Sequence, residues 1–114
     1  MHELSIATAI VETVLQEMQR RQLPAVSAVG VRVGALSGVV PDALEFSFQA
    51  IINGTPLAGA RLAIEQVPLQ GKCRNCGLDF SVQEFIFACP DCHSGQIEIT
   101  RGEELEIAYL EVSS

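Results

Sequence analysis

The sequence of 114 residues has no tryptophan, one tyrosine and five phenylalanines. Hydrophobic residues nevertheless make up 48% of the chain, so the core must consist mainly of valine, leucine, isoleucine and alanine side chains. No stretch reaches the ~20 consecutive apolar residues that a membrane-spanning helix needs. The first residues are polar and lack the basic start and apolar run of a signal peptide. We therefore expect a small cytoplasmic protein that does not enter a membrane.

Basic side chains are scarce as well. Seven lysines and arginines stand against fourteen acidic residues, which gives a formal net charge of −7. Binding to nucleic acid or to an anionic membrane surface depends on clustered lysine and arginine, but between Gln70 and Thr100 only Lys72 and Arg74 are basic. The charge balance argues against a nucleic-acid partner and favours cations or basic protein surfaces.

Hydrophobic periodicity predicts two helices and three strands. Apolar residues from Leu4 to Met18 recur every three or four positions, which predicts a helix over 5–22 with Leu4 on its buried face and Ser5 as its N-cap. A second helix is expected from Pro41 to about residue 52. Alternating apolar residues predict strands over 26–33, 61–67 and 104–112. We expect an α+β fold of two layers, in which the three strands form one sheet and the last strand returns to it across an insertion.

Four cysteines form two C-x-x-C pairs, Cys73 with Cys76 and Cys89 with Cys92, and twelve residues separate the pairs. A spacing of two residues lets both sulfurs of one tight turn bind a single ion, and two such turns complete a tetrahedral Zn(II) site. Two disulfides are the first alternative, disfavoured by the absence of an export signal. A redox-active dithiol is the second, but it would need one C-x-x-C that opens a helix. Four sulfurs leave no open coordination position, so the predicted zinc site is structural rather than catalytic.

The chain starts with Met1, His2 and Glu3. A single histidine near a chain end is commonly only an exposed residue. Methionine is expected to stay in place before histidine, because the aminopeptidase that removes it prefers a small second residue. The Met1 amine, the His2 imidazole and the neighbouring backbone amides, including that of Glu3, can then reach one ion. A square-planar set of nitrogen ligands favours Ni(II) or Cu(II) over Zn(II).

Four features of the sequence occur in a fixed order: the start Met1 to Ser5, the run from Val33 to Phe46, the two cysteine pairs, and the stretch from Gly102 to Leu105. This combination resembles the HypA/HybF family, whose members are accessory proteins that insert nickel during the maturation of [NiFe]-hydrogenases. The resemblance extends over essentially the whole chain. The Met-His-Glu start together with the cysteine module is its specific part.

The resemblance implies a nickel-binding α/β domain, with a three-stranded sheet and two helices, at 1–69 and 101–114. It implies a zinc-ribbon-like domain at 70–100, inserted before the last strand. Ni(II) would bind at Met1 and His2, with Glu3 supporting binding or transfer. The implied partners are the accessory GTPase HypB and the hydrogenase large subunit, and some relatives also serve urease. A monomer and a homodimer both stay open.

One position departs from the pattern of some relatives, which carry a histidine beside both cysteine pairs. His93 follows Cys92, but Gly77 follows Cys76. We therefore expect His93 beside the zinc ligands rather than among them.

Two functions are compatible with these residues. The leading hypothesis is a nickel metallochaperone that binds Ni(II) at its N-terminus and delivers it to the hydrogenase large subunit. The alternative is a protein-interaction adaptor that is stabilised by zinc and has no nickel site. An enzyme is not expected, because the sequence shows no Ser/His/Asp set, no phosphate-binding loop and no open metal site.

Overall fold

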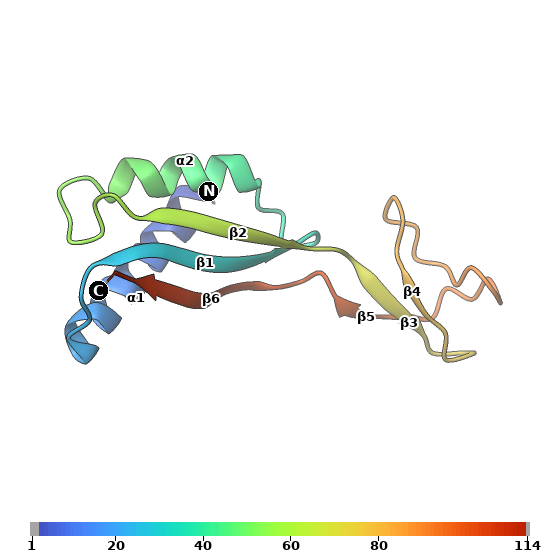
Figure 1. Cartoon of the computed structure of the whole chain (residues 1–114). Helices are drawn as coiled ribbons and strands as arrows, with labels where there is room; N and C mark the ends of the chain where they lie inside the picture. Colours follow the sequence, from blue (N-terminus) through green and yellow to red (C-terminus); the bar gives the residue numbers. More distant parts are fainter. Residues whose placement is uncertain (1–2, 114) are drawn as a thin grey trace. The chain divides into compact units, whose positions relative to one another are not determined.

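The structure, a computed structural model, describes residues 3–113. Two helices and six strands follow one another in the order α1 (Glu3–Arg21), β1 (Val26–Gly34), α2 (Pro41–Ile51), β2 (Arg61–Val67), β3 (Gln70–Cys73), β4 (Asp79–Ser81), β5 (Ile97–Arg101) and β6 (Leu105–Val112) (Figure 1). The described chain divides into two compact units. The first comprises residues 3–32, 39–65 and 106–113, and the second comprises residues 33–38 and 66–105.

The first unit is built on a three-stranded sheet in the order β2-β1-β6, so β1 is the central strand. β1 and β2 run in the same direction, which is possible because α2 forms the crossover between them (Figure 1). β6 runs the opposite way. Gly34 N donates to Glu104 O at one end of the β1–β6 pair, and Ser113 N donates to Ala25 O at the other. The last strand therefore returns to the sheet of the first strand, as predicted.

The core of the first unit is aliphatic, as the scarcity of aromatic residues predicted. Phe48 is the only fully buried aromatic side chain among the described residues. Each fully buried valine, leucine or isoleucine contributes roughly 1.5–3 kcal/mol to folding. The buried core residues of α1, α2 and β1 include Ala7, Ile10, Val11, Val14, Val29, Val31, Val33, Leu44 and Phe48.

Charged side chains pair across the strands of the first unit. Arg32, which lies between buried Val31 and Val33 on β1, contacts Glu65 of β2 at 3.2 Å and Glu106 of β6 at 3.0 Å. All three side chains are exposed, so each pair contributes little to stability.

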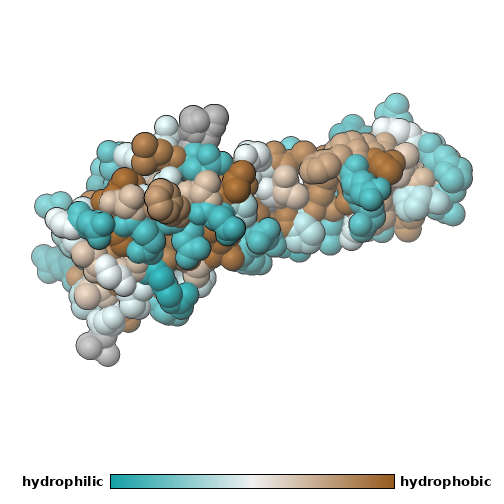
Figure 2. All heavy atoms as spheres, turned by 90° about the horizontal axis from the view of Figure 1, so that it is seen from above, coloured by the Kyte–Doolittle hydropathy of each residue, from teal (hydrophilic) through white to brown (hydrophobic). Residues whose placement is uncertain are grey.

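On the surface viewed from the side of α2, hydrophobic residues are interspersed with hydrophilic ones (Figure 2).

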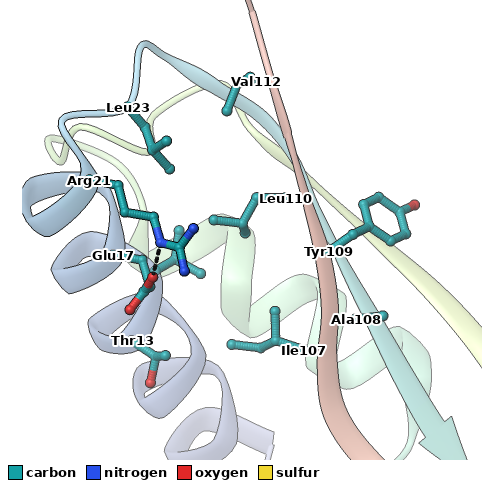
Figure 3. A pocket seen from close by; sticks show the side chains of 10 residues that line it. Thr13, Glu17, Arg21, Leu23, Ile107, Ala108, Tyr109, Leu110 and Val112 are labelled. Carbon is teal, nitrogen blue, oxygen red and sulfur yellow. Dashed lines mark hydrogen bonds and ion pairs between the residues drawn. The ribbon is translucent and has the colours of Figure 1, made fainter.

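A groove of about 680 Å³ lies between α1 and β6 in the first unit. Figure 3 shows Ile107 and Leu110 of β6 pointing toward α1, whereas Tyr109 points away from it. An ion pair between Arg21 Nε and Glu17 Oε1, 2.8 Å apart, lies at this groove. The groove contains none of the cysteines, so it is separate from the predicted zinc ligands.

The second unit contains a smaller sheet in the order β4-β3-β5. β3 pairs antiparallel with both neighbours, and its register against β5 shifts between Gln70 and Gly71. Periodicity predicted none of these strands, because three to five residues are too few to establish an alternating pattern. β3 ends at Cys73, so this sheet presents the first cysteine pair.

The expected elements of the first unit are confirmed, with two corrections. α1 begins at Glu3, so the prediction of Ser5 as its N-cap was wrong. Leu4 was expected on the buried face of this helix but is 58% exposed, while Ile10 is buried instead. Neither helix in residues 3–113 is long and apolar enough to cross a membrane.

Two glycines of β1 permit close approaches that a side chain would prevent. A Cβ atom at Gly34 would overlap the backbone carbonyl of Gly102, and one at Gly30 would overlap the ring of Tyr109. We expect Gly34→Ala to lower the free energy of unfolding by about 3 kcal/mol, because the overlapped atoms belong to the backbone of Gly102 and Glu103 and cannot rotate away as a side chain can. Gly30→Ala should cost only about 1 kcal/mol, because the exposed Tyr109 ring can rotate away. Chemical unfolding measures both values.

Tyr109→Ala provides the control for this comparison. In the Tyr109→Ala background, Gly30→Ala should no longer lower the free energy of unfolding, while Gly34→Ala should lower it as before. Equal costs for the two alanine variants in the native background would contradict the assignment of the two close approaches.

Candidate metal centre

Each cysteine pair lies in a tight turn with the same backbone hydrogen bonds. In the first turn, Cys73 N donates to Leu78 O at 2.9 Å and Gly77 N donates to Cys73 O at 2.8 Å. The second turn repeats both bonds between Cys89 N and Ser94 O and between His93 N and Cys89 O, each at 2.9 Å. We call residues 73–78 the first knuckle and residues 89–94 the second knuckle. Each residue of the first knuckle therefore has a counterpart at the same position of the second knuckle.

The two knuckles bring all four sulfurs together. Cys73 Sγ lies 3.5 Å from Cys92 Sγ, and Cys76 Sγ lies 3.6 Å from Cys89 Sγ. All four Sγ atoms are within 4.8 Å of one another. A tetrahedron with Zn–S bonds of ~2.3 Å has S–S edges of roughly 3.8 Å, so the donor set fits Zn(II). No other group of three or more metal-ligating side chains in the described part of the chain lies close enough to share an ion.

Backbone amides surround the sulfur atoms. Cys73 Sγ accepts hydrogen bonds from Asn75 N and Cys76 N, and Cys89 Sγ accepts them from Asp91 N and Cys92 N, all at 3.4 Å. Such donors stabilise thiolates, the form in which cysteine binds metal. These amide donors therefore favour the thiolate form of Cys73 and Cys89.

The thiols of Cys76 and Cys92, the second cysteines of the two pairs, differ in their pKa. The Asn75 side chain, which donates from Nδ2 to Cys92 Sγ at 3.4 Å, lowers the pKa of the Cys92 thiol to about 6, with help from the Ser94 amide. The Leu78 amide lowers the pKa of the Cys76 thiol, but hydrogen bonding with Cys89 and loss of hydration outweigh it and raise this pKa to about 12.

His93 lies at the position of the second knuckle that Gly77 occupies in the first. Both have left-handed backbone geometry, with φ of 65° at His93 and 83° at Gly77. A residue with a side chain resists this conformation, whereas glycine adopts it freely. His93 lies outside the group of four ligand atoms and lines a hollow that Cys89 and Phe80 also line. That His93 lies beside the zinc ligands rather than among them stays a prediction.

At the other predicted site, Met1 and His2 lie outside the described residues. Glu3 is the first residue of α1, and its Oε2 accepts a hydrogen bond from Val40 N at 3.0 Å. Val40 is the N-cap residue of α2 and supplies no side-chain cap. The hydrogen bond from Val40, followed by that from the Glu3 amide, lowers the pKa of the Glu3 carboxyl below 4.5. The contact is thus present at neutral pH and is lost as pH falls through this lowered pKa.

The structure defines a class of protein: a small α+β protein that carries a closed module of four cysteines suited to a structural Zn(II) ion. A family model described as "Hydrogenase/urease nickel incorporation, metallochaperone, hypA" matches residues 1–112, so the chain belongs to the HypA family. The resemblance found in the sequence is thereby confirmed. The protein is a nickel-incorporation metallochaperone of hydrogenase maturation, and its role is that of a maturation factor rather than an enzyme.

Curated relatives match over nearly their whole length. Hydrogenase maturation factor HypA of Geobacter metallireducens is 45% identical over 112 residues, which cover 98% of this chain and 99% of the relative. The protein of the same name in Chloroflexus aurantiacus is also 45% identical over 112 residues, with 97% and 98% covered.

Two solution structures share the fold at 23% identity. The Ni metallochaperone HypA from Helicobacter pylori has a TM-score of 0.68, covering 98% of this chain and 97% of its own. A second HypA protein has a TM-score of 0.74, with 99% and 97% covered.

Sequence reasoning missed two residues that contact the predicted sites. Asn75 donates from one knuckle to a sulfur of the other, and Val40 donates to Glu3 from a helix 37 positions away. The repeated knuckle pattern offered a signal for Asn75, because its position two residues after Cys73 is shared by Asp91 after Cys89. No sequence signal pointed to Val40.

The left-handed position of His93 yields a stability prediction. His93→Gly should raise the free energy of unfolding of the zinc-loaded protein by about 1 kcal/mol, because it removes the cost of a positive φ. Gly77→Ala should lower it by a similar amount. Zinc content should stay the same in the glycine variant. Denaturant titration of the loaded protein gives both values, and a loss of zinc from His93→Gly would instead make the histidine a ligand.

Proposed function

We propose that this protein binds Ni(II) through its N-terminal residues and delivers it to the hydrogenase large subunit, while Cys73, Cys76, Cys89 and Cys92 hold a structural Zn(II) ion. The observation that carries the zinc assignment is the group of four sulfurs within 4.8 Å of one another. The family assignment supports the role in nickel incorporation. We further propose a nickel-binding domain at 1–69 and 101–114 and a zinc domain at 70–100.

In the proposed nickel site, the Met1 amine, the His2 imidazole and adjacent backbone amides ligate the ion. α1 begins at Glu3, and the first amides of a helix lack intrahelical acceptors. The Glu3 carboxylate is engaged with Val40 N, so we assign it a positioning role rather than ligation. A terminal site with few side-chain ligands suits cargo, because the ion can pass to an acceptor by stepwise exchange of ligands.

The zinc site has a different role in this proposal. Zn(II) on four thiolates would supply no chemistry beyond holding the two knuckles together. Cys73 and Cys89 are buried at 0% and 1% exposure and belong to the core of their unit. Folding of the knuckles would therefore be coupled to metal binding.

The partners follow from the proposed delivery. A GTPase of the HypB type and the hydrogenase large subunit are the proposed macromolecular partners, and the family description also names urease. We place the protein in the cytoplasm. The net charge of −7 suits basic protein surfaces rather than nucleic acid.

Metal stoichiometry tests the proposed nickel site. The native protein should bind one Ni(II) and one Zn(II), whereas His2→Ala, or extra residues before Met1, should abolish nickel binding and leave zinc unchanged. Nickel affinity should fall as pH decreases through the imidazole pKa of about 6.5, because neutral imidazole is the ligand. Metal analysis and nickel titration measure these changes. Equal nickel binding by native and extended proteins would favour the zinc-stabilised adaptor instead.

Variants of Glu3 test whether its carboxylate positions or ligates. Glu3→Gln keeps an oxygen that accepts from Val40 N but removes the charge, so nickel affinity should stay within about threefold of the native value. Glu3→Ala removes the acceptor and should weaken nickel binding by about tenfold. Titration of both variants at pH 7.5 decides the point. Equal losses in the two variants would make the carboxylate a ligand.

A further inference from the structure

The two knuckles are alike in their backbone and differ in one pair of side chains. Asn75 of the first knuckle corresponds to Asp91 of the second, since each stands two residues after the first cysteine of its pair and donates its backbone amide to that sulfur. The side chains have opposite capabilities. An asparagine amide donates hydrogen bonds, whereas a carboxylate only accepts them.

This difference is expressed at the second cysteine of each pair. Asn75 Nδ2 reaches across to the opposite knuckle and donates to Cys92 Sγ at 3.4 Å. The residue of the second knuckle that corresponds to Asn75 is Asp91, whose carboxylate offers no hydrogen-bond donor. Cys92 therefore has a side-chain donor that its counterpart lacks.

The exposure of the four cysteines also distinguishes Cys76 from Cys92. Cys73 and Cys89 are buried and Cys92 is partly buried, while Cys76 is exposed. A sulfur leaves a metal ion more readily when water and solutes reach it. It is also more nucleophilic when fewer hydrogen bonds draw charge from it.

We propose that Cys76 is the exchangeable ligand of the zinc site and that Asn75 determines this by holding Cys92 in place. The inference rests on the proposed four-cysteine site and deepens it, because it assigns unequal roles to ligands that are chemically identical. With zinc bound, Cys76 would be the sulfur that yields its place to an incoming thiolate or neutral imidazole, and it would take up a proton from water as it leaves. Cys73, Cys89 and Cys92 would keep the two knuckles joined.

The test uses zinc-loaded full-length protein and a limiting amount of N-ethylmaleimide, followed by fragment-ion mapping of the four cysteines. Cys76 should be labelled first, about tenfold faster than Cys92. Asp91→Asn, which supplies the missing donor and removes the charge, should slow labelling of Cys76. Asn75→Ala should speed labelling of Cys92 without adding a charge.

The double exchange Asn75→Asp with Asp91→Asn provides the decisive variant. It preserves composition and net charge and should shift preferred labelling from Cys76 to Cys92. If Cys76 stays first by the same margin in the double exchange, exposure alone sets the order and the role of Asn75 is wrong. Uniform labelling of all four cysteines in native protein that contains one zinc also overturns the inference.

Zinc content, measured before labelling, separates this inference from the proposed site. Native protein without zinc would remove the four-cysteine site itself. Native protein with one zinc and a different order of labelling would leave that site intact and remove only the special status of Cys76.

Discussion

The chain directly after β1 holds both ends of the cysteine-bearing insertion. Ala35 N donates to Val67 O at 3.1 Å, where the chain leaves β2, and Leu36 N donates to Gly102 O at 2.7 Å, where the chain comes back. Because one short segment binds the outgoing and the returning chain, β6 enters beside β1 in a fixed register. In the sheet order β2-β1-β6, the strand before the insertion and the strand after it both pair with β1. The insertion therefore lies in sequence between two strands that flank the same central strand.

The sequence predicted those features that a local pattern encodes. β2 was expected at 61–67 and is found at Arg61–Val67, and α2 begins at Pro41 as expected. The cysteine spacing predicted which four sulfurs would come together, because ligand geometry restricts the gap within each pair to a few residues. Hydrophobic alternation and cysteine spacing are short-range properties of the sequence, so they can be recognised without knowledge of the fold.

The remaining features depend on contacts that form only in the folded chain. The start of α1 was misplaced because serine is a common N-cap, whereas the acidic residue at position 3 is held by Val40 N of a distant segment. Strands β3, β4 and β5 escaped detection because each is short and stabilised by pairing rather than by its own pattern. The hydrogen bond from Asn75 to Cys92 requires both knuckles to face one another, which no count of residues reveals.

The separation of β1 from β6 along the chain affects how the protein folds. The side chain of Ser27 on β1 donates to the backbone of Glu111 on β6, a contact between residues 84 positions apart. Contacts of this length slow folding, because a long loop must close before the pairing is gained. A metal ion that joins the two knuckles shortens the effective length of that loop. A link between Cys73 and Cys92 bypasses only 19 of the 84 intervening positions, which lowers the closure cost by roughly 0.2 kcal/mol. The pairing of β6 with β1 therefore depends on closing a long loop whether or not an ion joins the knuckles.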